Sequence, residues 1–197
     1  RYHTGLPYYE DKELVGYYPC LVSIVSEPSG KVKNLHQTFI TKEGFKADLK
    51  QAKKLAVRIP IRNETGGGIR LMDSSSSDTL AVGEGIETAL SWSVMFGGNV
   101  WACVNASMLS NFMPPNGIKT VIAITDNDYP DHRGQRAGMN AALKLRERLA
   151  PFGIEVKISL APKEGGDWND ELMQFLHNSA PVTETVHDDY YSCYDEP

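Results

Sequence analysis

Apolar and polar residues alternate in short runs over the first part of the chain, as they do in half-buried β-strands. The stretch YYPCLVSIVSEP at 17–28 is rich in β-branched and aromatic residues, and VKNLHQTFIT at 32–41 alternates like a strand with one buried face. PSGK at 28–31 and KEG at 42–44 contain residues that favour turns. Residues 14–49 therefore predict a β-meander.

The pattern changes at residue 79, where short apolar runs begin to alternate with segments of helical period. Strands are predicted at 79–85, 100–105, 119–128 and 154–162, with helices at 86–96, 106–113, 134–153 and 167–178. Alternating strands and helices imply a parallel sheet with right-handed crossovers.

The serine-rich stretch DSSSSD at 73–78 is the best candidate for a boundary between these two patterns. We therefore expect a small β-rich N-terminal subdomain at 1–78 and an α/β domain at 79–180. Residues 181–197 are polar and acidic, which indicates a tail or a linker.

The amino-acid composition bears on the hydrophobic core, on nucleic-acid binding, on zinc sites and on contact with membranes. A hydrophobic content of 41% is sufficient for a packed core, and a net charge of −5 still permits a local basic face for nucleic acid. Three widely separated cysteines with no CxxC pair argue against a zinc site and fit a reducing cytosol. No apolar run approaches the length of a membrane span, so we expect a cytoplasmic protein without membrane contacts.

Carboxylates stand where the apolar runs of the second half stop. Glu84 lies between two glycines after the first strand, Asp126 and Asp128 follow a later strand, and Asp167 and Asp170 open the last helix. In an open α/β sheet the carboxyl ends of the strands border the ligand crevice. Plainer roles are also open: an N-cap or a partner of the helix dipole for Asp167 and Asp170, a cap or turn for Asp126, and a solvated strand end for Glu84.

Convergence of these acids would favour bound cations, because neighbouring carboxylates repel one another. Oxygen ligands without histidine or cysteine suit Mg²⁺ or Mn²⁺. Magnesium held by a few carboxylates and by substrate phosphates is the arrangement of phosphoryl transfer.

Three motifs, VGEGIETAL, ITDND and GGDWNDEL, resemble in their order and spacing the Toprim catalytic domain of bacterial-type primases, topoisomerases and some nucleases. The sequences GEGIETAL and DWND most resemble those of Toprim primases from phages, plasmids and other mobile elements. The opening stretch and the segments LHQTFIT and GGGIRL also resemble the part that precedes Toprim in those proteins. The resemblance implies the Toprim fold, a four-stranded parallel sheet flanked by helices.

The resemblance also implies roles for the acids. Glu84 matches the motif glutamate, a metal ligand or acid/base group, and Asp126 and Asp128 match the metal-binding pair. Asp167 looks like the downstream acid, with Asp170 as a possible helper, and two Mg²⁺ or Mn²⁺ ions are implied. Glu87 matches a position that is often acidic in primases.

Two departures from the family pattern stand out. The chain has no cysteines for the N-terminal zinc module of such primases, and it has no GxxxxGK[ST] motif of a P-loop helicase. Template recognition and unwinding would then need other segments or other subunits.

Basic residues are candidates for contacts with the phosphates of template and nucleotides, although a solvated surface is an equally open interpretation. The residues are Lys53, Lys54, Arg58, Arg62, Arg70, Arg133 and Arg136. Trp168 is expected to anchor the last helix by packing rather than to stack on bases.

Three hypotheses of function follow. The first is a DNA primase core that makes short RNA primers on single-stranded DNA from NTPs, during replication of a phage or mobile element and with a replicative helicase as partner. The second is a magnesium-dependent nuclease that uses the same acids. The third is a non-catalytic module that binds single-stranded nucleic acid.

Overall fold

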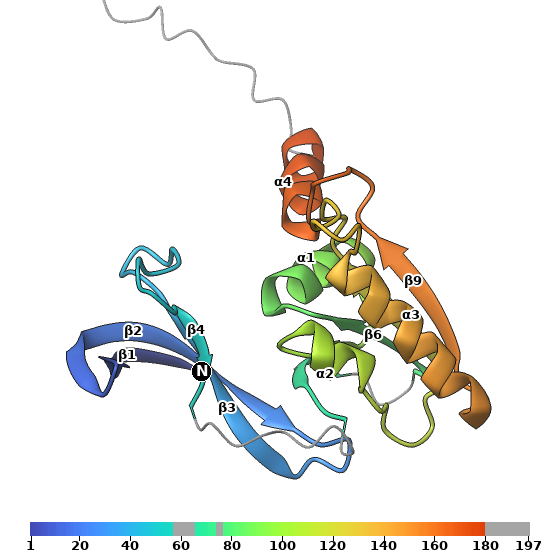
Figure 1. Ribbon diagram of the computed structural model, residues 1–197, viewed down its shortest axis with the longest axis horizontal. Helices are drawn as coiled ribbons and strands as arrows, with labels where there is room; N and C mark the ends of the chain where they lie inside the picture. Colours follow the sequence, from blue (N-terminus) through green and yellow to red (C-terminus); the bar gives the residue numbers. More distant parts are fainter. Residues whose placement is uncertain (57–65, 74–76, 180–197) are drawn as a thin grey trace, which may run out of the picture.

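The computed structural model describes residues 1–56, 66–73 and 77–179, whose strands form two β-sheets lying side by side (Figure 1). The first sheet is antiparallel and its strands follow chain order. Its members are β1 (Tyr2–Glu10), β2 (Glu13–Ser26), β3 (Val32–Phe39) and β4 (Lys53–Leu55). The predicted N-terminal β-meander is therefore confirmed, and it is longer than the sequence pattern indicated.

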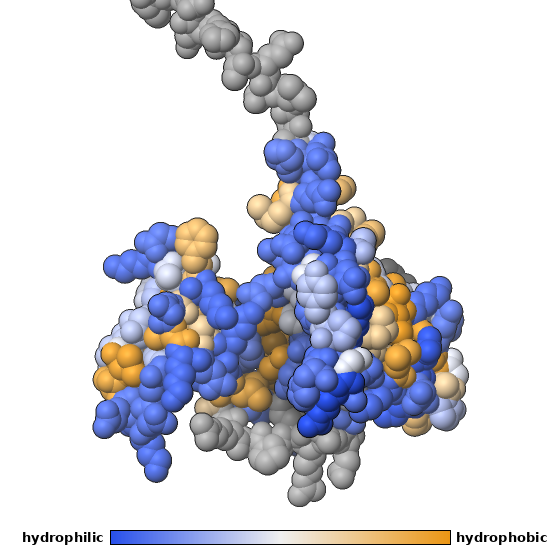
Figure 2. Space-filling view, turned by 45° about the horizontal axis from the view of Figure 1, so that its top comes forward, coloured by the Kyte–Doolittle hydropathy of each residue, from blue (hydrophilic) through white to orange (hydrophobic). Residues whose placement is uncertain are grey.

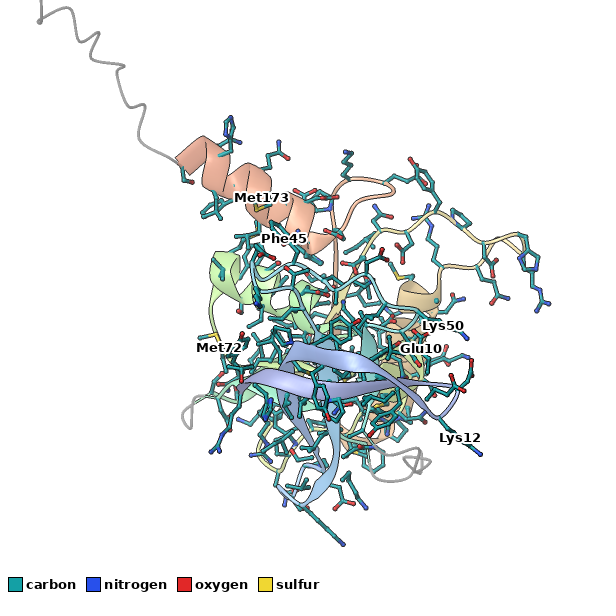
Figure 3. The ribbon with its side chains drawn as sticks, turned by 90° about the vertical axis from the view of Figure 1, so that its left-hand side faces the viewer. Glu10, Lys12, Phe45, Lys50, Met72 and Met173 are labelled. Carbon is teal, nitrogen blue, oxygen red and sulfur yellow. The ribbon has the colours of Figure 1, made fainter. Side chains whose placement is uncertain are left out.

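Strand β1 lies outside the stretch predicted as β-rich, because Gly5 and Pro7 interrupt its alternation. Proline is tolerated there since β1 is an edge strand that pairs only with β2. Asp11 and Lys12 connect the two strands with φ values of 46° and 75°, as a tight hairpin turn requires. Figure 3 shows Lys12 at the outer end of this hairpin.

The second sheet contains five strands in the order β5-β7-β6-β8-β9. Four of them are parallel, as predicted: β6 (Thr79–Gly83), β7 (Val100–Ala102), β8 (Thr120–Thr125) and β9 (Glu155–Leu160). Strand β5 (Ile69–Met72) runs antiparallel at the edge, so the sheet is mixed. The boundary at 73–78 stays a prediction, but β5, on its N-terminal side, belongs to the second sheet.

Helices cover both faces of the second sheet, because neighbouring residues of each strand point to opposite sides. Leu80 and Val82 of β6 pack against α2 (Ala106–Ser110) and α3 (Ala137–Leu149). Ala81, between them, packs against α1 (Ile86–Phe96) and α4 (Trp168–Ser179). A short 3₁₀ turn, η1 (Ala150–Phe152), ends α3 at Pro151. In the described part of the chain, no helix has both the length and the apolar character to span a membrane.

In the described part of the chain, backbone hydrogen bonds join the two sheets where β2 ends and β5 begins. Ser26 at the end of β2 and Gly68 before β5 exchange two N–H···O bonds of 3.0 Å. Arg70 strengthens this junction, because its guanidinium donates to the Pro28 carbonyl at 2.9 Å and stacks over Trp101. Gly67 permits the close approach: a Cβ there would lie 2.4 Å from the Ser26 carbonyl oxygen.

We expect Gly67→Ala to lower the free energy of unfolding by about 2–3 kcal/mol, because the methyl group would force the two sheets apart at their backbone junction. Urea unfolding followed by tryptophan fluorescence measures this change. Gly5→Ala is the matched control, since the nearest atom to its new Cβ would be 3.7 Å away. Equal stability of the two variants would contradict this account of the junction.

Candidate functional site

A cavity of about 450 Å³ lies between the two sheets, within the size range of small-molecule sites. Its first wall is the inner face of the N-terminal sheet, and its second wall is the carboxyl edge of β6 and β8 with the beginnings of α1 and α4. Figure 2 shows the hollow between the two bodies. The side chains that carry its polar chemistry are Ser23, His36, Thr38, Lys53, Glu84, Glu87, Thr88, Asp126, Asp167 and Asn169.

Glu84 directly follows β6, where the sheet ends and α1 has not yet begun. The strand end and the helix are close, because a Cβ at Gly83 would lie 3.2 Å from that of Ala89. Burial raises the pKa of the Glu84 carboxyl, and the charges of Asp126 and Asp128 raise it further. This acid therefore holds its proton more tightly than a solvated glutamate does.

Asp126 follows β8 and is fixed by two helices. Its Oδ2 accepts a hydrogen bond from the hydroxyl group of Thr88 in α1 at 3.0 Å. Its Oδ1 accepts a hydrogen bond from the backbone N–H of Trp168 in α4 at 3.3 Å. Burial raises the pKa of the Asp126 carboxyl, and these two hydrogen bonds partly offset that increase. The neighbouring charges of Asp167 and Asp128 act in the same direction as burial.

Asp167 lines the cavity and also caps α4. Its Oδ1 accepts from the Asp170 N–H at 2.8 Å, so the capping role open to this pair belongs to Asp167. Asp170 lies in the first turn of α4 with its side chain exposed, and it is not part of the cavity wall. The N-terminus of α4 thus directs N–H groups at both Asp126 and Asp167.

Asn127 ties the end of β8 to the loop before α4. Its side chain donates to the Ala161 carbonyl at 3.0 Å, and its backbone N–H donates to the Gly166 carbonyl at 3.0 Å. Arg136 donates to the Asn127 Oδ1 at 2.6 Å and to the Glu164 carboxylate at 2.5 Å. The residue between the two aspartates is therefore a structural brace.

Asp128, the second of those aspartates, is exposed and is not part of the cavity wall. Its charge nevertheless reaches the site, because it raises the pKa of both Glu84 and Asp126. Arg133 lies beyond it on the same exposed loop, with its guanidinium donating to His132 at 3.2 Å.

The remaining basic candidates have different surroundings. Lys53 lines the cavity and forms an ion pair with Glu87. Lys54 lies on the opposite face of the N-terminal sheet, with its ammonium 3.9 Å from the centre of the Tyr8 ring. Arg70 belongs to the junction between the sheets, and its role in phosphate binding stays a prediction. Arg58 and Arg62 lie outside the described residues.

His36 lies outside the three sequence motifs and Thr88 lies within VGEGIETAL, but the sequence pattern assigned a role to neither. His36 is only 6% exposed, and burial together with the charge of Lys53 lowers its pKa, so the imidazole is neutral. It lies on the same strand face as Thr38, a pattern visible in β3, but no sequence signal tells which face meets the acids. Trp168 is 4% exposed and its indole donates to the Thr125 carbonyl at 3.1 Å, which confirms the packing role expected for it.

Oxygen ligands for a divalent cation are present in this cavity. Among the described residues, no group of three or more histidine, cysteine or acidic side chains is arranged so that it could hold a metal ion by itself. Mg²⁺ in proteins is commonly held by one or two carboxylates, with waters and substrate phosphates completing its shell. The pKa values of Glu84 and Asp126 are raised first by burial and then by neighbouring negative charge, and a cation would relieve that repulsion. The donor set therefore fits Mg²⁺ or Mn²⁺ bound together with a phosphate ligand.

Comparison with known proteins agrees with this geometry. A family model described as the Toprim domain matches residues 79–177, just over half of the 197-residue chain. A model of a domain of unknown function, DUF7146, matches residues 1–65. A search of the curated proteins gives no match.

Solved structures similar to this chain include a DNA primase domain from Pseudomonas aeruginosa, with a TM-score of 0.50 and 13% identity over 86% of this chain and 52% of that one. The catalytic core of DnaG gives a TM-score of 0.52 at 14% identity, over 79% of this chain and 48% of that one. The RNA polymerase domain of Mycobacterium tuberculosis primase DnaG gives a TM-score of 0.50 at 13% identity, over 86% of this chain and 56% of that one. At these identities the likeness is one of fold, and the chain spans about half the length of the structures it matches.

We expect Glu84→Gln to raise the free energy of unfolding by about 0.5–2 kcal/mol at pH 7 in EDTA, because it removes a charge from a crowded, half-buried site. The folded-state pKa of Glu84 lies above its ordinary value of 4.5, so the folded protein holds this proton more tightly than the unfolded chain. The stability linked to that proton is complete below the ordinary pKa and is lost as the pH rises through the raised one.

Urea unfolding of wild type and variant at several pH values from 4 to 8 measures this effect. The gain from Glu84→Gln should be smallest at the acid end and should grow as the pH rises. A gain that is the same at every pH, or a loss at pH 7, would contradict the electrostatic account of the site.

Proposed function

The chain belongs to the Toprim domain family, and from this premise we propose that it is the catalytic core of a DNA primase. In this proposal it joins NTPs into short RNA primers on single-stranded DNA. The observation that carries the proposal is the convergence of Glu84, Asp126 and Asp167 on a cavity whose other wall is the N-terminal sheet with Lys53. The similarity in fold to solved primase domains supports the same choice.

The chain's own residues would bind and orient the reactants. Thr88 and the N-terminus of α4 hold Asp126 in one orientation, and the α4 cap does the same for Asp167. Lys53 on the opposite wall would contact a phosphate group. Fixed placement of this kind supplies much of the rate in phosphoryl transfer, where the protein itself contributes little covalent chemistry.

Two divalent cations complete the proposal, with Glu84, Asp126, Asp128 and Asp167 as the residues that would hold them. When bound, Mg²⁺ or Mn²⁺ would neutralise phosphate charge and activate the attacking hydroxyl group. Burial raises the pKa of Glu84, so it holds a proton more readily than a solvated glutamate and could take part in proton transfer.

We further place the protein in the cytoplasm of a bacterial host, in the replication of a phage or mobile element. Single-stranded template, NTPs and the nascent RNA primer would be its ligands there. Template recognition and unwinding would come from other segments or from a partner helicase, because this sequence has neither the cysteines of a zinc module nor a GxxxxGK[ST] motif.

We expect Asp126→Asn to reduce primer synthesis at least about hundredfold, because the neutral amide cannot replace a carboxylate that stabilises charge on the reacting phosphates. The assay incubates the chain with mixed-sequence single-stranded DNA, labelled NTPs and Mg²⁺ or Mn²⁺, and resolves the products on a denaturing gel. Glu155→Gln is the matched control, since Glu155 pairs with Lys157 on the exposed surface of β9.

Short labelled oligomers from wild type and control, lost in Asp126→Asn, are the expected result. Shortened template without oligomers would favour a nuclease instead. A variant that primes at the wild-type rate would remove Asp126 from the active site, and a wild-type chain that makes no oligomers would contradict the proposed function.

A further inference from the structure

One ion pair crosses the cavity from wall to wall. The Lys53 ammonium of β4 contacts the Glu87 carboxylate of α1, and both residues line the cavity. The two side chains are 39% and 57% exposed, so water and salt screen their attraction and the pair is weak. By contrast, the junction at Ser26 and Gly68 is made of backbone hydrogen bonds.

The charges of the cavity wall are unequal. Among the described residues that line it, four are acids, Glu84, Glu87, Asp126 and Asp167, and Lys53 is the one cation. His36 contributes no compensating charge, because its buried imidazole is neutral. The positive group that an entering anion could use is thus already engaged by an acid.

Glu87 itself is placed differently from the other acids. It lies in the first turn of α1, more exposed than Glu84 or Asp126, and its carboxylate contacts Lys53. Asp126, by comparison, accepts hydrogen bonds from α1 and α4. The position of Glu87 fits a partner of the lysine better than a member of the acid group at the strand ends.

We propose that Lys53 binds a phosphate group in this cavity and that Glu87 is an internal competitor, which holds the lysine until the phosphate displaces it. This proposal rests on the proposed function and deepens it. The ligand is the phosphate of a nucleotide or of a single-stranded nucleic acid, and in either case Lys53 exchanges one anionic partner for another.

The exchange predicts a particular salt dependence. In the wild type, a phosphate that binds Lys53 releases the cation that had accompanied it in solution. The freed Glu87 carboxylate takes up a cation at the same time, so the net release of cations is close to zero. Without the Glu87 charge the release is no longer compensated. The slope of log K against log salt should then steepen by about 0.7 for a single strand.

The test compares Glu87→Gln, Lys53→Gln and the double variant with wild type, and Asp78→Asn is the control because it removes an acid from the exposed pair with Lys119. One arm titrates ATP with Mg²⁺ by calorimetry, and the other follows the fluorescence anisotropy of labelled (dT)₁₂ at several salt concentrations. We expect Glu87→Gln to bind about two- to tenfold more tightly than wild type. We expect Lys53→Gln to bind more weakly and to abolish the gain in the double variant.

A gain in the ATP arm identifies a nucleotide as the source of the phosphate, and a gain in the DNA arm identifies the template strand. Equal or weaker binding by Glu87→Gln in both arms would overturn the proposal. So would a gain that persists without Lys53, or an absence of binding by every chain. Because binding is measured without primer synthesis, a wild type that primes while Glu87→Gln shows no gain would refute this inference alone.

Discussion

Repulsion between half-buried carboxylates at the ends of neighbouring parallel strands is the constraint around which this protein is organised. Glu84 and Asp126 directly follow β6 and β8, which pair with each other, and burial together with the charge of Asp126 raises the pKa of Glu84. Their placement costs stability, and it persists because α1 and α4 supply a hydroxyl group and helix N–H groups that favour the ionised form of Asp126. The bracing of the loop before α4 by Asn127 has the same purpose, since it keeps that helix terminus aimed at the acids.

The N-terminal sheet turns this acidic edge into a cavity. Its inner face contributes Lys53 and the neutral His36. The backbone junction at Ser26 and Gly68 sets the position of that face relative to the second sheet. A sheet edge alone would leave the carboxylates in bulk solvent, where ligands bind weakly and charges are screened. The N-terminal sheet encloses the carboxylates and adds Lys53, the one cation that the described cavity lining contains. The carboxylates at the strand ends and the lysine of the N-terminal sheet are therefore complementary parts of one site.

Much of this could be predicted from the sequence, because apolar runs of strand length alternate with helical segments and place Glu84 and Asp126 at strand ends and Asp167 at the start of a helix. The sequence pattern does not predict strand β1, because Gly5 and Pro7 interrupt its alternation. It also assigns β5 to the N-terminal subdomain, because the pairing of β5 with β7 across a serine-rich stretch leaves no local signal in the sequence. Adjacent residues show the limit most clearly. Lys53 and Lys54 look alike in sequence, yet strand alternation sends one into the cavity and the other onto the Tyr8 ring. The contribution of His36 depends on which sheet face meets the acids, which is a tertiary property.

The most direct test of the central claim is Mn²⁺ binding, measured by electron paramagnetic resonance as the loss of the free-ion signal during titration. Wild type should bind Mn²⁺ in the presence of a non-hydrolysable nucleotide, and Glu84→Gln and Asp126→Asn should each weaken that binding tenfold or more. Asp78→Asn, which lies in an exposed ion pair, should bind as wild type does. Equal Mn²⁺ affinity in all four proteins would contradict the assignment of this carboxylate edge as the metal-binding centre of the molecule.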